Sequence, residues 1–363
     1  MSLAAPAMTG PARNPRGNKS GIAELKQPPA TSQSILAGPA WGKTFDLLWR
    51  HGLKDFDEWH VRQRERQEKQ QAVVKVLEDP DVAGVDKQHR RCVHILEYRR
   101  TLFSCPNCWM VPALCVCRHL RTFDIRTKLV VHMHHTEWGR CSNTGCVATV
   151  SLPGNAERLI KGHREHDARL EALMHDPTYT VAVLWPGSDA VTPNELKRIA
   201  QERSGGRIAV VAVDANWDGA LRMKCSYPKD VLYVKVLPEA VLRGGEESLL
   251  RPLRHYRGDL ETNGRVSTLE AIAALLGELE EQEPDIQAAL CQNLRIKVDA
   301  ALLQKHRPPV YGSVGSTLDA NCKEEARQLA EAWMAKHSAT AEYGSVPAEV
   351  QAMLREAALA DKD

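Results

Sequence analysis

No apolar run in the 363-residue sequence approaches the roughly 18 residues that a membrane-spanning helix needs. The apolar core of a secretory signal peptide is also missing, and no internal repeat is present. We therefore expect a soluble, cytoplasmic protein, with an organellar or nuclear location as the alternative. The hydrophobic content of 43% is enough to build a sizeable core, which excludes wholesale disorder.

The sequence also has almost no net charge, because 48 Lys and Arg residues face 46 Asp and Glu residues and leave +2. A near-neutral total argues against a nucleic-acid partner only if the charge is evenly spread. Residues 86–128 hold nine basic and three acidic side chains, whereas residues 266–363 hold nine basic and sixteen acidic ones. The basic middle permits a polyanion partner, although two ordinary solvated faces would have the same composition.

Composition and periodicity divide the chain into five regions. Residues 1–40 are rich in Ala, Pro, Gly and Ser, which predicts a disordered arm. Residues 41–90 form a helical extension, either RNA-facing or simply solvated, and residues 91–127 form a cysteine-containing zinc knuckle. Residues 128–282 alternate strands with helices, and residues 283–363 form a helical C-terminal extension with helices at 285–304, 317–337 and 347–360.

Short runs rich in β-branched residues predict four strands: Lys128–His135, Thr180–Trp185, Arg207–Val213 and Val231–Leu237. Helical patterns fall between them, at about residues 155–174, 193–203 and 216–225. Near-continuous apolar strands that alternate with helices indicate an α/β fold with a parallel sheet covered on both faces.

Four of the ten cysteines have metal-ligand spacing, as Cys105-Pro-Asn-Cys108 followed by Cys115-Val-Cys117. Such paired thiolates can surround a tetrahedral structural zinc ion, with buried reduced thiols or a redox pair as the alternatives. Basic side chains beside the cluster could contact phosphates: Arg99, Arg100, Arg118 and Arg121. Other cysteines without ligand spacing are interpreted as packing residues: Cys92, Cys225, Cys291 and Cys322.

Polar residues follow the predicted strands, where ligands bind in parallel α/β sheets. Asp214 comes directly after the third strand and is a candidate general base, or else the cap of the next helix. Ser267 and Glu270 form a capping box that opens a helix. Arg251 and Arg254 precede this helix, and arginine side chains beside a helix N-terminus suit the binding of an anion. The histidines at 132, 134 and 135 could suggest a second metal, but His134 and His135 point to opposite sides of a strand.

The order of these motifs resembles the DTW-domain family of tRNA-uridine aminocarboxypropyltransferases over roughly residues 95–282. The resemblance rests on CxxC and CxC, HxxE followed by NTG, LWPG, DxxW followed by AxxM, and STLEA. The signature Asp-Thr-Trp stands here as Asp214-Ala215-Asn216-Trp217, with Asn216 at the threonine position. The family's tyrosine after Ser248 is absent, and His135 stands where the family usually has proline.

The resemblance implies a SPOUT-like fold with a knotted carboxyl end that binds S-adenosylmethionine, the co-substrate. It further implies transfer of the 3-amino-3-carboxypropyl group to a uridine ring nitrogen of tRNA, with release of methylthioadenosine and Asp214 as the base. Alternatives are a SPOUT-type RNA methyltransferase and a non-catalytic zinc-containing RNA-binding protein. The expected residues for binding S-adenosylmethionine are Asn143, Thr144, Leu184, Pro186, Gly187, Trp217, Arg254, Ser267 and Thr268.

Overall fold

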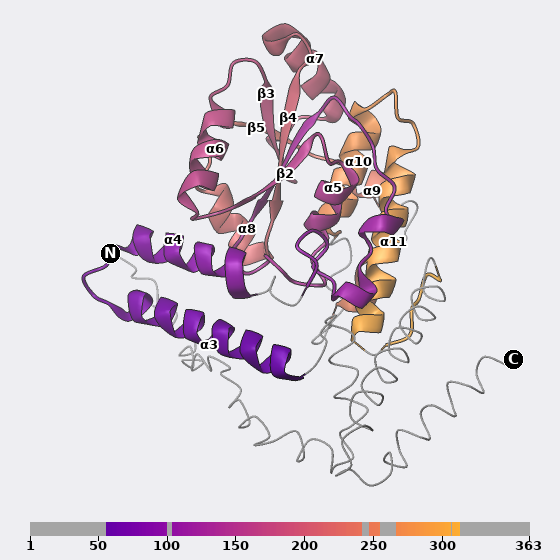
Figure 1. Ribbon diagram of the computed structural model, residues 1–363. Coiled ribbons are helices and arrows are strands. Elements are labelled where there is room, and N and C mark those ends of the chain that lie inside the picture. Colours follow the sequence, from indigo (N-terminus) through magenta and orange to yellow (C-terminus); the bar gives the residue numbers. More distant parts are fainter. Residues whose placement is uncertain (1–55, 100–103, 242–246, 255–265, 306, 313–363) are drawn as a thin grey trace, which may run out of the picture. The chain divides into compact units, whose positions relative to one another are not determined.

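The computed structural model describes residues 56–99, 104–241, 247–254, 266–305 and 307–312 (Figure 1). The predicted arm at 1–40, the first part of the helical extension and the predicted helices at 317–337 and 347–360 lie outside the described residues. Among the helices that are described, none combines the length and the hydropathy that crossing a membrane requires.

The fold is built on one five-stranded, all-parallel sheet, as the alternation of strands and helices predicts. The strands follow the spatial order β2-β1-β4-β3-β5. Their bounds are β1 Lys128–Met133, β2 Ala156–Ile160, β3 Thr180–Leu184, β4 Ile208–Asp214 and β5 Leu232–Val234. The central strand β4 and its neighbour β1 are aligned so that Met133 lies opposite Asp214, which places the carboxyl ends of both strands at the same edge.

Strand β2 differs from the prediction, because the helical pattern expected from about residue 155 begins only at α6 (Arg164–Met174). Residues 156–160 instead pair with β1, from Leu129 opposite Ala156 to Met133 opposite Ile160. The segment Ala-Glu-Arg-Leu-Ile contains good helix formers, but hydrogen bonding to a neighbouring strand overrides that local preference. β2 lies at an edge of the sheet, where its Glu157 and Arg158 side chains are only half-buried.

One face of the sheet carries the larger core. Leu129, Val131 and Met133 of β1 contribute to it, together with the cysteine-containing segment before β1. The helices on this face are α5 (Gly145–Ser151), α7 (Pro193–Ser204), α10 (Thr268–Leu279) and α11 (Ile286–Gln304). Apolar side chains of α11 thus share a core with the sheet, and the predicted helix at 285–304 is confirmed.

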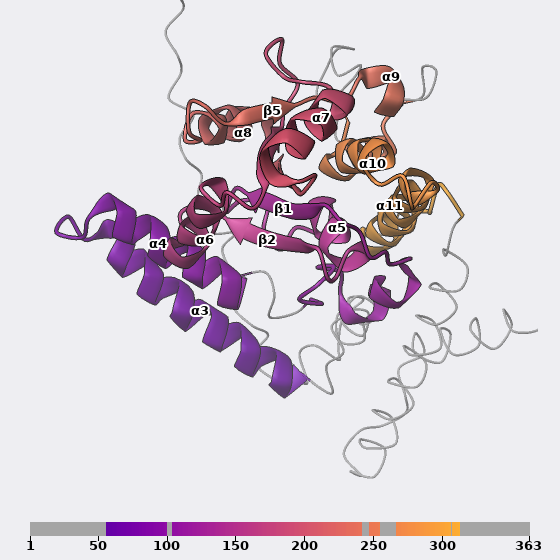
Figure 2. The same cartoon turned by 90° about the horizontal axis from the view of Figure 1, so that it is seen from above.

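The opposite face is covered by α6 and by the segment after α8 (Trp217–Lys224). Val130 of β1 faces this side because successive residues of a strand point to opposite faces. Figure 2 shows α6 on one side of β1 and β2, with α5 and α11 on the other. The sheet is therefore buried on both faces, which explains its nearly continuous apolar strands.

The remaining helices lie at the periphery of the sheet. α3 (Phe56–Glu78) and α4 (Gly84–His94) contact each other, and a π-helical turn, Ile95–Arg99, continues α4. Cys92 and Ile95 pack against Ile160 at the end of β2, which attaches this helical pair to the sheet. The short helical elements are Pro112–Leu114, Cys117–His119, α9 (Pro238–Val241) and Arg251–Leu253.

Candidate active site and cysteine cluster

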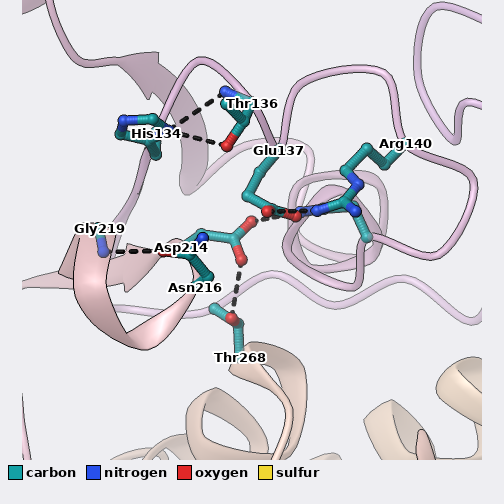
Figure 3. Close-up of polar contacts among 9 residues, drawn as sticks. His134, Thr136, Glu137, Arg140, Asp214, Asn216, Gly219 and Thr268 are labelled. Atoms are coloured by element: carbon teal, nitrogen blue, oxygen red, sulfur yellow. Dashed lines mark hydrogen bonds and ion pairs between the residues drawn. The ribbon is translucent and has the colours of Figure 1, made fainter. Parts of the chain in front are cut away.

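Asp214 ends β4 at the carboxyl edge of the sheet, and its side chain is buried, with 5% of the residue exposed. Its Oδ2 accepts a hydrogen bond from Asn143 Nδ2 at 2.7 Å, and its Oδ1 accepts one from Thr268 Oγ1 at 2.8 Å. Figure 3 shows the Thr268 contact, which joins the start of α10 to the end of β4. The carboxylate is thus held between two segments distant in the sequence.

The environment of Asp214 raises its pKa to about 6. Burial is the largest cause, because a charged carboxylate loses its hydration, and the nearby Glu137 carboxylate raises the pKa further. The hydrogen bonds from Asn143 and Thr268 act in the opposite direction, since they stabilise the charged form. A group with this pKa is mostly ionised at neutral pH and can accept a proton, as a general base must.

The Asn143-Thr144-Gly145 segment packs directly against this carboxylate. Asn143 Oδ1 accepts from the backbone N–H of Cys146 at 3.0 Å, which orients its amide nitrogen toward Asp214. A Cβ atom on Gly145 would lie 2.5 Å from Asp214 Oδ2, so only glycine fits there. Asn143 and Gly145 therefore both lie against the Asp214 carboxylate. The need for glycine at position 145 was not predicted from the sequence, although this glycine stands in the same motif.

The opening of α10 forms the opposite side of the site. The predicted capping box is confirmed, because Ser267 Oγ accepts from Glu270 N at 3.2 Å and Glu270 Oε2 accepts from Ser267 N at 2.7 Å. Glu270 is itself buried and accepts further hydrogen bonds from Ser248 Oγ and Leu249 N. The Glu270 carboxylate therefore caps α10 and also holds Ser248 and Leu249, which precede Arg251 and Arg254. The capping pattern in the sequence does not reveal this second role.

Arg251 and Arg254 follow Ser248 and Leu249 in the sequence. Arg251 forms an ion pair with Glu247, in which both side chains are half-exposed. Arg254 ends the short Arg251–Leu253 helix and is half-buried.

The alternative role for Asp214, capping the next helix, is wrong. Asn216 caps α8 instead, because its side-chain Oδ1 accepts from Gly219 N at 2.8 Å (Figure 3). Asparagine is among the best helix caps, which accounts for this contact. The Asp214 carboxylate does not cap α8 and instead accepts hydrogen bonds from Asn143 and Thr268.

Trp217 follows directly after this cap. It is 46% exposed and is therefore not a core residue. Its ring lies edge-on to that of Trp185, with centroids 6.3 Å apart.

The Leu184-Trp185-Pro186-Gly187 segment leaves β3 at the same edge of the sheet. β3 is the neighbour of β4, and Leu184 lies opposite Ala212, two residues before Asp214. Leu184 and Gly187 are half-buried and Pro186 is exposed. These residues and Trp217 share the edge with Asp214, whereas Asn143 and Thr268 contact its carboxylate directly.

The HxxE motif lies beside the site and makes polar contacts of its own. His134 N donates to the backbone oxygen of Asp214 at 3.0 Å, and its ring Nδ1 contacts Thr136 Oγ1 at 2.8 Å. Glu137 pairs with Arg140 Nη1 at 2.6 Å (Figure 3). His134 thereby positions β1 against β4, and Glu137 affects the pKa of Asp214 through its charge.

The four predicted zinc ligands form a compact group, the cysteine cluster of Cys105, Cys108, Cys115 and Cys117. All four sulfur atoms lie within 4.8 Å of one another, and the Cys105–Cys117 and Cys108–Cys115 Sγ pairs are each 3.7 Å apart. A tetrahedron with zinc–sulfur bonds of about 2.3 Å has edges of about 3.8 Å. The cluster therefore has the donor type and the spacing to hold a zinc ion.

The turn between the first two cysteines brings them together. Trp109 adopts a left-handed backbone conformation, with φ of 59°, and its N–H donates to Cys105 O at 2.9 Å. Cys105 N in turn donates to Met110 O at 2.7 Å. The local backbone therefore folds back on itself as a metal-binding turn requires, at the energetic cost of one strained non-glycine residue.

The arginines expected near the cluster have intramolecular partners. Arg121 pairs with Asp285 and lies over the Phe123 ring, and Arg118 Nε donates to His119 Nε2. The side chain of Arg99 and all of Arg100 lie outside the described residues.

The prediction that the other cysteines are packing residues is partly wrong. Cys92 is buried and Cys291 packs against the core, but Cys225, directly after the last residue of α8, is exposed. Cys322 lies outside the described residues.

Comparison with known proteins agrees with the motifs. The family model of the DTW domain matches residues 102–302, which is more than half of the chain. No match was found among curated proteins or among solved structures. The chain therefore belongs to the DTW-domain family, the tRNA-uridine aminocarboxypropyltransferase family.

Proposed function

We propose that this protein transfers the 3-amino-3-carboxypropyl group from S-adenosylmethionine to a ring nitrogen of a uridine in tRNA and releases methylthioadenosine. The observation that carries this proposal is the buried carboxylate of Asp214, held at the carboxyl edge of the sheet by Asn143 and Thr268. Membership of a tRNA-modifying family supports the class of substrate. The specific reaction is inferred from the chemistry that the site offers.

The uracil imide is a poor nucleophile until its nitrogen loses a proton, so the reaction needs a positioned base. Asp214 accepts that proton. The ring nitrogen then forms a bond to the terminal methylene of the aminocarboxypropyl group as the bond from this carbon to sulfur breaks. Sulfur keeps the electron pair of the broken bond, and the positively charged sulfonium becomes the neutral thioether of methylthioadenosine.

Selectivity for this methylene over the methyl group requires that the sulfonium be held in one orientation. We assign this role to the residues around Asp214, with Arg254 as the partner of the cofactor's carboxylate. The first amides of α10 are less suitable, because Glu270 N already donates to Ser267 Oγ and Leu269 N contacts Thr144 Oγ1 at 3.4 Å. The half-exposed Trp217 suits stacking on a base or adenine. The remaining proposed contacts come from Asn143, Thr144, Leu184, Pro186, Gly187, Ser267 and Thr268.

A SPOUT-like knot at the carboxyl end is part of the same proposal. The chain leaves the edge strand β5 and returns to the middle of the sheet, where Thr268 reaches Asp214 of β4. This return supports a path in which α10 closes a cofactor-binding loop.

We further propose that the cysteine cluster binds structural zinc and stabilises the segment before β1. A uridine in a loop of folded tRNA is the expected target, because a base within a duplex is inaccessible to a buried carboxylate.

The proposal is tested by mass spectrometry of tRNA incubated with the protein and S-adenosylmethionine. A gain of about 101 Da on one uridine is expected, whereas about 14 Da, with S-adenosylhomocysteine as co-product, would identify a methyltransferase instead. Asp214→Asn should abolish transfer while tRNA binding persists. The matched control is Asp218→Asn, the same change at an exposed position on α8, which should leave transfer intact. Binding of tRNA without any mass gain from the wild-type protein would favour the non-catalytic alternative.

A further inference from the structure

Lys297 of α11 is buried far more completely than a lysine ordinarily is. Only 1% of the residue is exposed, and it is among the largest fully buried side chains of the described chain. Its ammonium Nζ donates to the backbone carbonyl oxygen of Cys108, one of the four residues of the cysteine cluster. Lysine is almost never fully buried without a partner of opposite charge, because the ammonium loses its hydration.

No carboxylate supplies that opposite charge within the part of the chain that the structure describes. The ion pairs found there all join other side chains. Asp299, two residues along the same helix, instead accepts hydrogen bonds from Val310 N and Tyr311 N, at 2.8 and 2.9 Å. The carbonyl of Cys108 provides a dipole but no net charge.

The cysteine cluster can provide the missing negative charge. Four thiolates around one Zn²⁺ carry a net charge of −2. A second cation lies on the same cluster, since Arg158 Nη1 donates to the backbone oxygen of Asn107 at 3.0 Å. The Arg158 guanidinium also lies 5.1 Å from the ring centroid of Trp109, within the turn that carries two of the cysteines. Two cations therefore face a site that is doubly negative when loaded.

We propose that Lys297, together with Arg158, is the internal counter-charge of the zinc-loaded cysteine cluster. This inference rests on the zinc binding included in the proposed function. Metal occupancy and burial of Lys297 then stabilise each other. Without the metal the lysine is a buried charge with little compensation, and without the lysine the metal site holds an uncompensated negative charge.

The same contacts connect the cluster to the candidate active site. The carbonyl of Cys108 also lies 3.7 Å from the thiol sulfur of Cys146 at the start of α5. The backbone N–H of Cys146 donates to Asn143, which in turn donates to Asp214. Lys297 is thereby a positioning residue, at the far end of a chain of contacts that reaches the proposed base.

The experiment compares zinc binding and thermal stability of the full-length wild type, Lys297→Met and Lys297→Arg. Methionine keeps the length of the side chain and removes the charge. The matched control is Lys197→Met, which removes a lysine charge from an ion pair with Glu281 on the surface of α7. Competition with a chromophoric zinc chelator at fixed pH measures zinc affinity, and thermal unfolding is followed in the zinc-loaded and zinc-stripped forms.

Lys297→Met should bind zinc about 10- to 100-fold more weakly than the wild type, as is typical when a partner outside the ligand shell is lost. Lys297→Arg should retain more affinity than Lys297→Met, and the control should match the wild type. The midpoint of unfolding should fall for Lys297→Met in the zinc-loaded form and stay unchanged or rise in the stripped form. If the stripped protein does not fold, the chelator competition alone decides.

Two results would overturn the inference. One is unchanged zinc affinity in Lys297→Met, and the other is an equal loss of stability in both forms, which a packing role alone would produce. A wild type that binds no zinc would instead refute the zinc binding included in the proposed function, and metal analysis of the purified protein separates these failures without any measurement of transfer.

Discussion

Asp214→Asn is expected to make the protein inactive and at the same time more stable above pH 6. Burial raises the pKa of Asp214 from the usual 3.8 to about 6, which means that the folded state disfavours the ionised carboxylate. The shift corresponds to about 3 kcal/mol at a pH where the group is ionised in both states, since one pKa unit is about 1.36 kcal/mol. Asparagine is neutral at every pH and avoids this cost.

The pH dependence of this effect has a definite sign. Above pH 6 the carboxylate is ionised in both the folded and the unfolded protein. The stability of the wild type is then lowered by the full free energy of burying a charged carboxylate. As the pH falls through 6, the folded protein takes up a proton before the unfolded one does, and the wild type regains stability. The advantage of Asp214→Asn should therefore be largest near pH 8, fall to about half at pH 5 and vanish below pH 4.

Urea unfolding of both proteins at pH 5 and pH 8, with zinc held constant, measures this difference. Effects of the substitution on packing that do not depend on pH cancel in this comparison, whereas the hydrogen bonds to the ionised carboxylate are part of the pKa itself. A stability difference that is the same at pH 5 and pH 8 would show that burial does not perturb this carboxylate. The transfer rate of the wild type should likewise fall below pH 6, and a rate that stays constant down to pH 5 would argue against Asp214 as the base.

Three further predictions concern the surroundings of Asp214. Thr268→Val removes a hydrogen bond to the ionised form and should raise the pKa on the acid side of the rate profile by about one unit; an unmoved profile would contradict the contact. Gly145→Ala places a methyl group 2.5 Å from Asp214 Oδ2 and should cost about 1–3 kcal/mol of stability and most of the transfer activity. Gly154→Ala, whose nearest atom would be 3.9 Å away, is the control for both measurements. Removal of zinc by a chelator should lower transfer reversibly, because the cysteine cluster supports the Asn143 segment; activity retained in metal-free protein would refute that link.

Sequence patterns were most informative where the interactions are local. The capping box of α10 depends on Ser267 and Glu270, only three residues apart, and the structure confirms it. The spacing of the four cysteines identified a group whose sulfur atoms do converge. In the same way, the position of Asp214 after an apolar strand predicted its place at the carboxyl edge of the sheet.

The patterns failed where local preference and long-range contacts disagreed. The segment at 156–160 looks helical by composition, but it pairs with β1 and becomes an edge strand. The pattern around Asp214 left open whether it capped α8, and the cap is Asn216, because only there does the side chain meet the first free N–H groups of the helix. Periodicity describes neighbours within a few residues and carries no information on which distant segment will supply a partner.

The sequence by itself determined the family, the alternation of strands and helices, and the residue types that the proposed chemistry needs. Only the tertiary structure decided which of them meet. Asp214 is joined to Asn143 and Thr268 across 71 and 54 residues, and Lys297 reaches Cys108 across 189. The physical reason is that pKa values and charge compensation depend on burial and on distances through space, which the folded path of the chain sets.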